Sequence, residues 1–321
     1  MGGDKLKKIV VVLLLGLALF GVDLRPVHEG KIEGAVLDMV LGDGKIFIAT
    51  DASKVLVLDQ NFSTLQEIKV RQIKDFMGEL NNADIYSVDY LNGVILYLAQ
   101  AEDGYSELFL YKDGKKINVL DKSKMMYAKA AKFVDDKRAV LALMSDEVVL
   151  YDINAQKVLK RAKAGEYFYS VMSMDPKRKY IAIGDEGGEV IVVDPRTLQR
   201  VRLFKNINKD KILSITINDN LIAAGSRADK TLALYDIETG DTKVVKNPDF
   251  FIYVTGLSPD NSMVVYGDNE KYILKVLDTN SLGLRYRLIG HKNIVNVVRF
   301  EDDKTVITGS ETGEIKKWRL K

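Results

Sequence analysis

After residue 22 the chain alternates short runs of β-branched and aromatic residues with polar turns, and no stretch keeps the 3.6-residue apolar period of a helix. Pairs of these runs share one form: a strand, a polar turn, a second strand and then Asp, Lys or Arg. Seven copies are found, at residues 44–59, 94–112, 138–152, 179–194, 220–236, 262–278 and 304–319. The pattern predicts an all-β protein built from seven similar units.

The seven copies recur at a nearly constant spacing. Their second strands end on Leu58, Tyr111, Tyr151, Val193, Tyr235, Leu277 and Trp318, so the intervals are 53, 40, 42, 42, 42 and 41 residues. Another short strand precedes most pairs, and a fourth follows most of them. Four strands per unit and a period of about 40 residues are typical of β-propeller blades. We therefore predict an all-β fold, a seven-bladed β-propeller.

The seventh copy ends at Lys321 without a fourth strand, whereas residues 24–35 contain an extended strand and a turn before the first inner strand. The N-terminal strand can therefore complete the last blade. Such closure removes the free strand edges of an open sheet and joins the ring into one cooperative unit. The sequence predicts a single propeller domain over residues 22–321 with no internal boundary.

Residues 1–21 have the layout of a secretory signal peptide, with three lysines near the start and an apolar run over residues 9–22. The run is shorter than the roughly 20 residues of a membrane-spanning helix. Gly21 is a suitable small residue before a cleavage site, but Leu19 is a poor one two positions earlier. The segment is therefore predicted to be a signal peptide or an uncleaved N-terminal anchor, and both predict export.

Charge and residue counts exclude several classes of function. Beyond residue 21, 44 Lys and Arg face 44 Asp and Glu, so nucleic-acid binding is not predicted. The chain has no cysteine and only two histidines, His28 and His291, which excludes disulfides, thiolate metal sites and a three-histidine centre. No phosphate-binding or nucleophile motif is found. We predict a non-enzymatic protein without a metal or cofactor.

The last copy resembles the WD40 repeat. It has a Gly-His pair ending at His291, a TGS sequence beginning at Thr308, and Trp318 after a gap of 26 residues from the histidine. The resemblance implies a WD40-like propeller in which these three side chains form a hydrogen-bonded group inside the blade, and a buried network of this kind must be fully satisfied. Thr312 and Arg319 stand where the repeat has aspartates, and the other six copies lack the Gly-His pair and the tryptophan.

A narrower resemblance covers most of the chain. Its segments are QIKDFMGE at 72–79, IYSVDYLNGVIL at 85–96, AKFVDD at 131–136, LMSDEVVLYDI at 143–153, VTGLSPD at 254–260 and LIGHK at 288–292. With the predicted signal peptide and the lack of cysteine, they resemble the NapL family of periplasmic nitrate reductase accessory proteins from Epsilonproteobacteria. The resemblance implies a periplasmic, non-catalytic protein whose partner is a periplasmic nitrate reductase or one of its maturation factors.

Two alternative functions remain open. A metal-dependent propeller enzyme, of the lactonase or quinoprotein kind, would gather acidic ligands around the central channel. Asp38, Asp89, Asp175 and Asp260 lie near predicted inner strands and are the candidates. The second alternative is an outer-membrane assembly propeller, and the missing lipid-anchor cysteine counts against it.

The predicted partner-binding surface lies on the connections that enter the inner strands. The longest of them, residues 71–84, mixes apolar and charged side chains in a way suited to an interface, and the alternative is a short helix packed on the rim. Aromatic residues gather in other connections on the same face, where the alternative is packing between blades. The candidates are Ile73, Asp75, Phe76, Met77, Phe168, Tyr169, Phe250, Phe251 and Tyr253, on a protein predicted to be a monomer.

Overall fold

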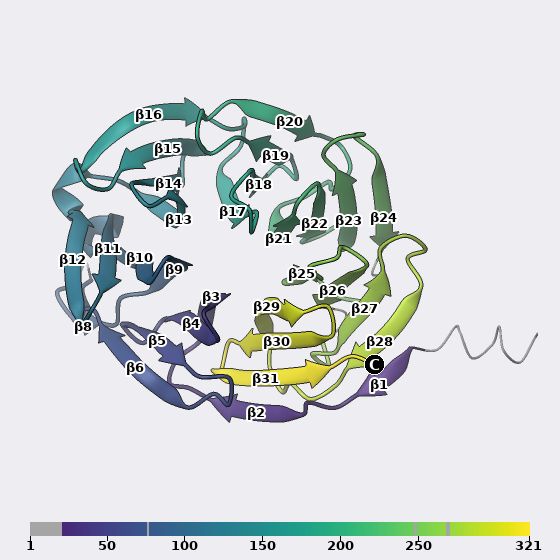
Figure 1. Cartoon of the computed structure of the whole chain (residues 1–321). Helices are drawn as coiled ribbons and strands as arrows, with labels where there is room; N and C mark the ends of the chain where they lie inside the picture. Colours follow the sequence, from purple (N-terminus) through teal and green to yellow (C-terminus); the bar gives the residue numbers. More distant parts are fainter. Residues whose placement is uncertain (1–20, 76, 247–248, 268–269) are drawn as a thin grey trace, which may run out of the picture.

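The computed structural model describes residues 21–75, 77–246, 249–267 and 270–321. Seven sheets stand as blades around a central axis, and the chain passes from one blade to the next around the ring (Figure 1). Two short 3-10 turns, η1 (Glu102–Gly104) and η2 (Lys122–Lys124), interrupt the strands. Within these ranges no helix has the length and apolar character needed to cross a membrane. The predicted seven-bladed β-propeller is confirmed.

Each blade has four antiparallel strands that run in order from the axis to the rim, because short polar turns join neighbouring apolar runs. The first three blades are β3 (Val36–Gly42), β4 (Lys45–Thr50), β5 (Lys54–Leu58) and β6 (Thr64–Lys69); β9 (Ile85–Leu91), β10 (Val94–Gln100), β11 (Ser106–Lys112) and β12 (Lys115–Leu120); and β13 (Ala128–Asp135), β14 (Arg138–Leu143), β15 (Glu147–Asp152) and β16 (Lys157–Lys163).

The remaining four blades follow the same order. They are β17 (Tyr169–Met174), β18 (Ile181–Asp185), β19 (Val190–Val193) and β20 (Arg200–Phe204); β21 (Ile212–Asn218), β22 (Leu221–Ser226), β23 (Thr231–Asp236) and β24 (Thr242–Lys246); β25 (Thr255–Leu257), β26 (Met263–Gly267), β27 (Leu274–Asp278) and β28 (Leu284–Leu288); and β29 (Val295–Asp302), β30 (Thr305–Ser310) and β31 (Glu314–Arg319), with an N-terminal fourth strand.

The N-terminal segment closes the ring. β2 (His28–Lys31) pairs antiparallel with β31, which confirms the predicted completion of the last blade. Just before it, β1 (Val22–Leu24) pairs parallel with β28 and adds a fifth strand to the sixth blade. The same short segment therefore joins the last two blades at the rim, where β1 and β2 lie side by side with β28 and β31 (Figure 1).

The long connection between the first two blades is a small hairpin and not a helix. Its strands are β7 (Ile73–Lys74) and β8 (Leu80–Asn81). The carboxylate of Asp75 holds the turn, because its Oδ1 accepts hydrogen bonds from the backbone N–H groups of Met77 (2.8 Å) and Glu79 (3.0 Å). The hairpin thus keeps the side chain of Met77 in a fixed place on the surface.

The core lies between neighbouring blades, where apolar side chains of adjacent sheets pack face to face. Glycine on the second strand permits close contact in several blades. A Cβ atom added to Gly225 would lie 2.3 Å from Ile252, and one added to Gly309 would lie 2.6 Å from Val36, each in the next blade. A larger residue at either position would push the two sheets apart.

Hydrogen bonds at the rim tie six of the seven blades to the next, and we call them the rim ties. They start from the fourth-strand residue that lies opposite the residue directly before Leu58, Tyr151, Val193, Tyr235, Leu277 or Trp318 in the third strand. Six blades have a rim tie: Gln66 to Tyr111 Oη, Lys160 to Thr197 O (2.6 Å), Arg202 to Glu238 O (3.0 Å), Lys243 to Thr279 O and Asn280 O (3.0 Å each), Tyr286 to Lys321 O (2.6 Å) and His28 to Asn61 O (2.8 Å). The second blade has Ile117 at this position.

The rim ties lead to a testable expectation. Replacing Lys160 with Met keeps most of the aliphatic stem but removes the donor, so we expect the free energy of unfolding to fall by about 0.5 to 1 kcal/mol in urea titrations. Lys157→Met on the same strand is the control, because Lys157 is not a tie residue. An equal loss in both variants would contradict a specific role for the tie.

Candidate functional site

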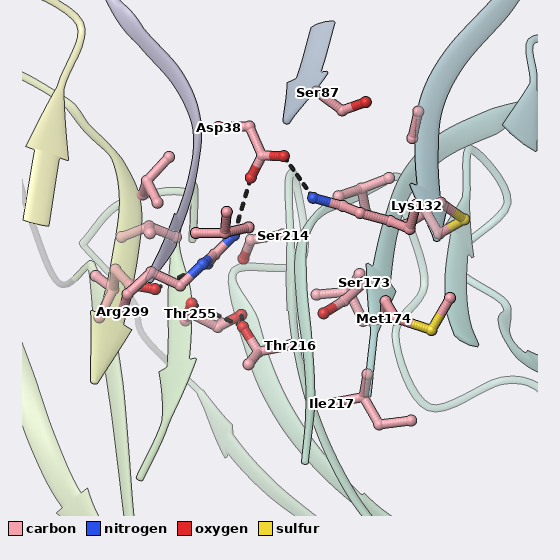
Figure 2. Close-up of a pocket in the computed structure, with 18 of the residues that line it drawn as sticks. Asp38, Ser87, Lys132, Ser173, Met174, Ser214, Thr216, Ile217, Thr255 and Arg299 are labelled. Carbon is pink, nitrogen blue, oxygen red and sulfur yellow. Dashed lines mark hydrogen bonds and ion pairs between the residues drawn. The ribbon is translucent and has the colours of Figure 1, made fainter. Parts of the chain in front are cut away.

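The seven inner strands enclose a central cavity of about 990 Å³. Residues from all seven inner strands, β3, β9, β13, β17, β21, β25 and β29, line this channel. Charged groups such as Lys132 and Arg299 share its wall with hydroxyl, methionine and aliphatic side chains (Figure 2). The channel wall is therefore partly charged and partly apolar, and its charged residues determine which ligands it could bind.

Asp38 is the centre of an ion-paired group in the channel (Figure 2). Its carboxylate receives Lys132 Nζ at 2.6 Å from the third blade and Arg299 Nη2 at 3.0 Å from the seventh. Burial alone would raise the pKa of Asp38, but the charges of Lys132 and Arg299 hold it below its ordinary value. Lys132 also donates to the Val88 carbonyl at 2.7 Å. The group links blades one, two, three and seven from inside.

A second ion pair links blades two, three and four. Arg178 Nη1 lies 2.7 Å from Asp89 Oδ2 and donates to the Phe133 carbonyl at 2.6 Å. The same carboxylate accepts the backbone N–H of Phe133 at 2.7 Å. Arg178 therefore extends from the fourth blade past the third to the second. Its charge and that of Asp89 neutralise each other in a contact that links the blades.

The four carboxylates considered as metal ligands do not act as a group. Asp38 and Asp89 are paired with cations, Asp175 accepts the Asp219 N–H at 2.8 Å, and Asp260 accepts the Ser258 hydroxyl at 2.6 Å. Among the residues that the structure describes, no three His, Asp or Glu side chains are placed to hold a metal ion. The channel geometry therefore offers no ligand set for the metal-dependent alternative.

Exposed apolar side chains gather on one face of blades one to four. In an antiparallel blade, the start of the inner strand and the end of the second strand lie at the same end of the sheet. The β7–β8 hairpin, the connections before β13 and β17, and the turn after β14 all lie at this end. They present an apolar crescent, defined as Met77, Leu80, Met125, Tyr127, Met144, Tyr167 and Phe168, whose residues are 44 to 73% exposed.

Backbone hydrogen bonds hold neighbouring parts of the apolar crescent together. Met144 N–H donates to the Tyr127 carbonyl at 3.0 Å, and Tyr169 N–H donates to the Met144 carbonyl at 3.3 Å. The ring of Tyr127 also packs on that of Tyr105, with 4.6 Å between centroids. Met144 and Tyr169 line the channel as well, so the crescent continues into the channel mouth.

The predicted residues of the long connection have different environments. Ile73 is buried and anchors the hairpin. The carboxylate of Asp75 accepts a backbone hydrogen bond of the turn. Met77 is the most exposed large apolar side chain described, at 73%. Phe76 lies outside the described residues. Of this predicted group, Met77 is the one that the structure places on the crescent.

The predicted aromatic residues divide into two groups. Phe168 is 66% exposed on the crescent, and the half-buried Tyr169 beside it faces the channel, where burial raises the pKa of its phenol. Phe250, Phe251 and Tyr253 are half-buried and pack on one another, with centroids 5.6 to 6.0 Å apart. The second group therefore packs as a cluster within one connection.

The implied group of the last blade is formed in part. His291 Nε2 lies 2.6 Å from Thr308 Oγ1, and Glu314 accepts from His291 Nδ1 at 3.4 Å. The Trp318 ring packs 5.4 Å from the imidazole, but its Nε1 has no hydrogen-bond partner in the described residues. Burial, with Lys316 nearby, lowers the pKa of His291 to about 4, so the ring is neutral and structural.

Three buried carboxylates surround the base of the connection that carries Tyr167 and Phe168. Asp146, Asp185 and Glu189 are at most 6% exposed. A Cβ atom on Gly165 would lie 2.6 Å from Asp146 Oδ2 and 3.3 Å from Asp185 Oδ2, so both oxygens flank this glycine. Burial raises the pKa of Asp146 to about 7, and the charge of Asp185 adds to the rise against the nearby Gly165 N–H. This carboxyl group therefore titrates near neutral pH.

Neither a family model nor a curated protein matches this chain. The fold and the surface described above are therefore the basis for the function proposed below. Leu80 and Tyr167 lie in connections that the sequence had singled out, but Met125, Tyr127 and Met144 were missed. Their place in the blade pattern could have indicated them. Each lies just before an inner strand or just after a second strand, and these connections lie on the same face of the propeller.

Proposed function

We propose that the protein is an exported, non-catalytic accessory protein that binds a protein partner through the apolar crescent. The observation that carries this proposal is the distribution of exposed apolar side chains. Of the fifteen large ones in the described chain, seven form the crescent on blades one to four, and the others lie on outer strands or next to β2. Large apolar side chains gathered on one face of a monomer are typical of a protein contact site.

The composition of the crescent also supports a protein partner. Three of its seven residues are methionines, whose flexible thioether side chains adapt to varied surfaces. Its aromatic members, Tyr127, Tyr167 and Phe168, supply the large contact area on which protein interfaces depend. Such a surface suits recognition of another polypeptide better than binding of a small polar substrate.

The partner we propose is a periplasmic nitrate reductase or one of its maturation factors. Two segments that resemble the NapL family carry crescent residues: QIKDFMGE contains Met77, and LMSDEVVLYDI contains Met144. The WD40-like last blade, with His291 bonded to Thr308, fits a propeller that serves as an interaction scaffold. These observations favour an accessory role at that enzyme.

Affinity capture of the tagged full chain from nitrate-grown cells tests the proposal. We expect nitrate reductase subunits or maturation factors to be recovered with the wild-type protein. Met77→Asp combined with Phe168→Asp places two charges in the crescent, and we expect recovery to fall at least tenfold because both anchors lose their apolar contact.

The matched control is Val27→Asp combined with Leu65→Asp, two residues of similar exposure away from the crescent. Both double variants should unfold within a few degrees of the wild type, because surface changes have small effects on stability. Equal recovery of the partner with the crescent and control variants would contradict the proposed binding surface. Recovery of unrelated proteins alone would contradict the proposed partner.

A further inference from the structure

Basic side chains are concentrated on the outer rim of the propeller. The fourth strands of the seven blades carry fourteen Lys or Arg residues and only two Glu, although the chain beyond residue 21 is neutral overall. Acidic residues in the turns between the strands balance this excess when charge is summed along the sequence. In space the fourth strands form the rim of the ring, so their cations lie on one belt.

The belt is strongest over three adjacent blades, on β16, β20 and β24 (Figure 1). These three strands contain no acidic residue and eight basic ones, which we call the basic arc: Lys157, Lys160, Arg161, Lys163, Arg200, Arg202, Lys243 and Lys246. Within the described residues, only Arg161 and Lys163 of this arc have an acidic partner, at 3.6 and 3.4 Å. Most of the arc is therefore a source of positive potential toward solvent.

Exposed apolar side chains are interleaved with these cations. Val158, Leu159, Val201 and Val244 lie on the same three strands and are 40 to 44% exposed. Basic residues mixed with aliphatic ones are typical of surfaces that lie at a lipid interface. Single-stranded nucleic acid is instead bound with aromatic stacking platforms, and the one aromatic residue on these strands, Phe204, is buried.

The N-terminus enters the propeller on the same rim. β1 begins at Val22 on the outer edge of the sixth blade, which adjoins the blade that ends in β24 (Figure 1). In sequence, the apolar run of residues 9–22 leads directly into this strand. A chain arriving from a membrane would thus reach the rim and not either face of the ring.

We propose that the basic arc docks on an anionic phospholipid surface, with the propeller standing on its edge. Each Lys or Arg close to such a surface adds to the attraction, which weakens within a Debye length. Edge-on docking leaves the apolar crescent free, because the crescent lies on a face of the ring. The proposal does not depend on the identity of the crescent's partner.

Vesicle flotation with the full chain tests the proposal. The rim variant is Lys157→Glu, Arg200→Glu and Lys246→Glu, which spares every rim tie. The control variant is Lys45→Glu, Lys124→Glu and Lys209→Glu, three exposed residues elsewhere with the same change in net charge. The apolar N-terminal segment is present in all three proteins, so its contribution cancels.

We expect the rim variant to bind vesicles of 30% phosphatidylglycerol in phosphatidylcholine at least tenfold more weakly than the wild type, and the control variant to lose less than threefold. The difference should shrink in 0.5 M salt. Equal losses in the two variants, equal binding to pure phosphatidylcholine, or tighter binding to single-stranded DNA than to the vesicles would each overturn the proposal.

Discussion

Asp146→Asn is expected to stabilise the protein at pH 8 by up to about 4 kcal/mol. The buried Asp146 carboxyl group has its pKa raised to about 7, from 3.8 in a solvated aspartate. Between these values the folded protein holds a proton that the unfolded chain has released, so the stability of the wild type falls as the pH rises from about 4 to 7. Asparagine is neutral throughout and escapes this loss.

Urea unfolding at pH 4 and at pH 8 measures the effect. We expect the two proteins to differ little at pH 4, where the folded carboxyl group is protonated and the unfolded one is about half ionised, and to diverge at pH 8. Asp103→Asn, an exposed change in a turn, is the control and should leave the pH profile unaltered. A parallel pH profile for Asp146→Asn and the wild type would show that Asp146 does not titrate in this range.

The opposite result is expected at Asp38. Asp38→Asn leaves the side chain of Lys132, which is 8% exposed, without its carboxylate at 2.6 Å. Removing one member of a buried ion pair typically costs about 3 to 5 kcal/mol, because the remaining charge is desolvated without compensation. The pKa of Asp38 is lowered, so its contribution is present above about pH 3.8 and is lost as the pH falls further.

A double-variant cycle separates the charge effect from a packing effect. Lys132→Met combined with Asp38→Asn removes both charges, and we expect it to recover part of the stability lost by Asp38→Asn alone in urea unfolding at pH 7. Losses that simply add would mean that the pair is not coupled, and the account of the channel given above would then be wrong.

The propeller was predictable from sequence because each blade repeats the same hairpin at nearly the same interval. The signal is local: the third strand has an apolar residue such as Tyr151 or Tyr235 just before its final aspartate, and that residue is buried between blades in the structure. Ring closure could also be inferred, since the last unit lacked a strand and residues 24–35 offered one. The parallel pairing of β1 gave no such signal, because three residues are too few to show a period.

The candidate site was less predictable, because its exposed apolar and charged residues come from separate segments that are brought together only by the fold. Met77 could be singled out because its connection is unusually long. Met125 and Met144 lie in short connections that resemble those of the other blades. The pairing of Lys132 with Asp38 joins residues 94 positions apart, and nothing in either segment specifies the other. The basic arc escaped notice for the same reason, since acidic turns separate its strands along the chain.

The closing strand has a consequence for the order of events in folding. β2 is synthesised near the start, yet Glu29 pairs with Lys316, 287 residues later. Contacts between such distant segments form late, because a large loss of chain entropy precedes them. Until the last blade has been made, the ring cannot close, and β31 has no outer neighbour. A ring that is joined by two segments so far apart in the chain therefore stays open until both segments have been synthesised.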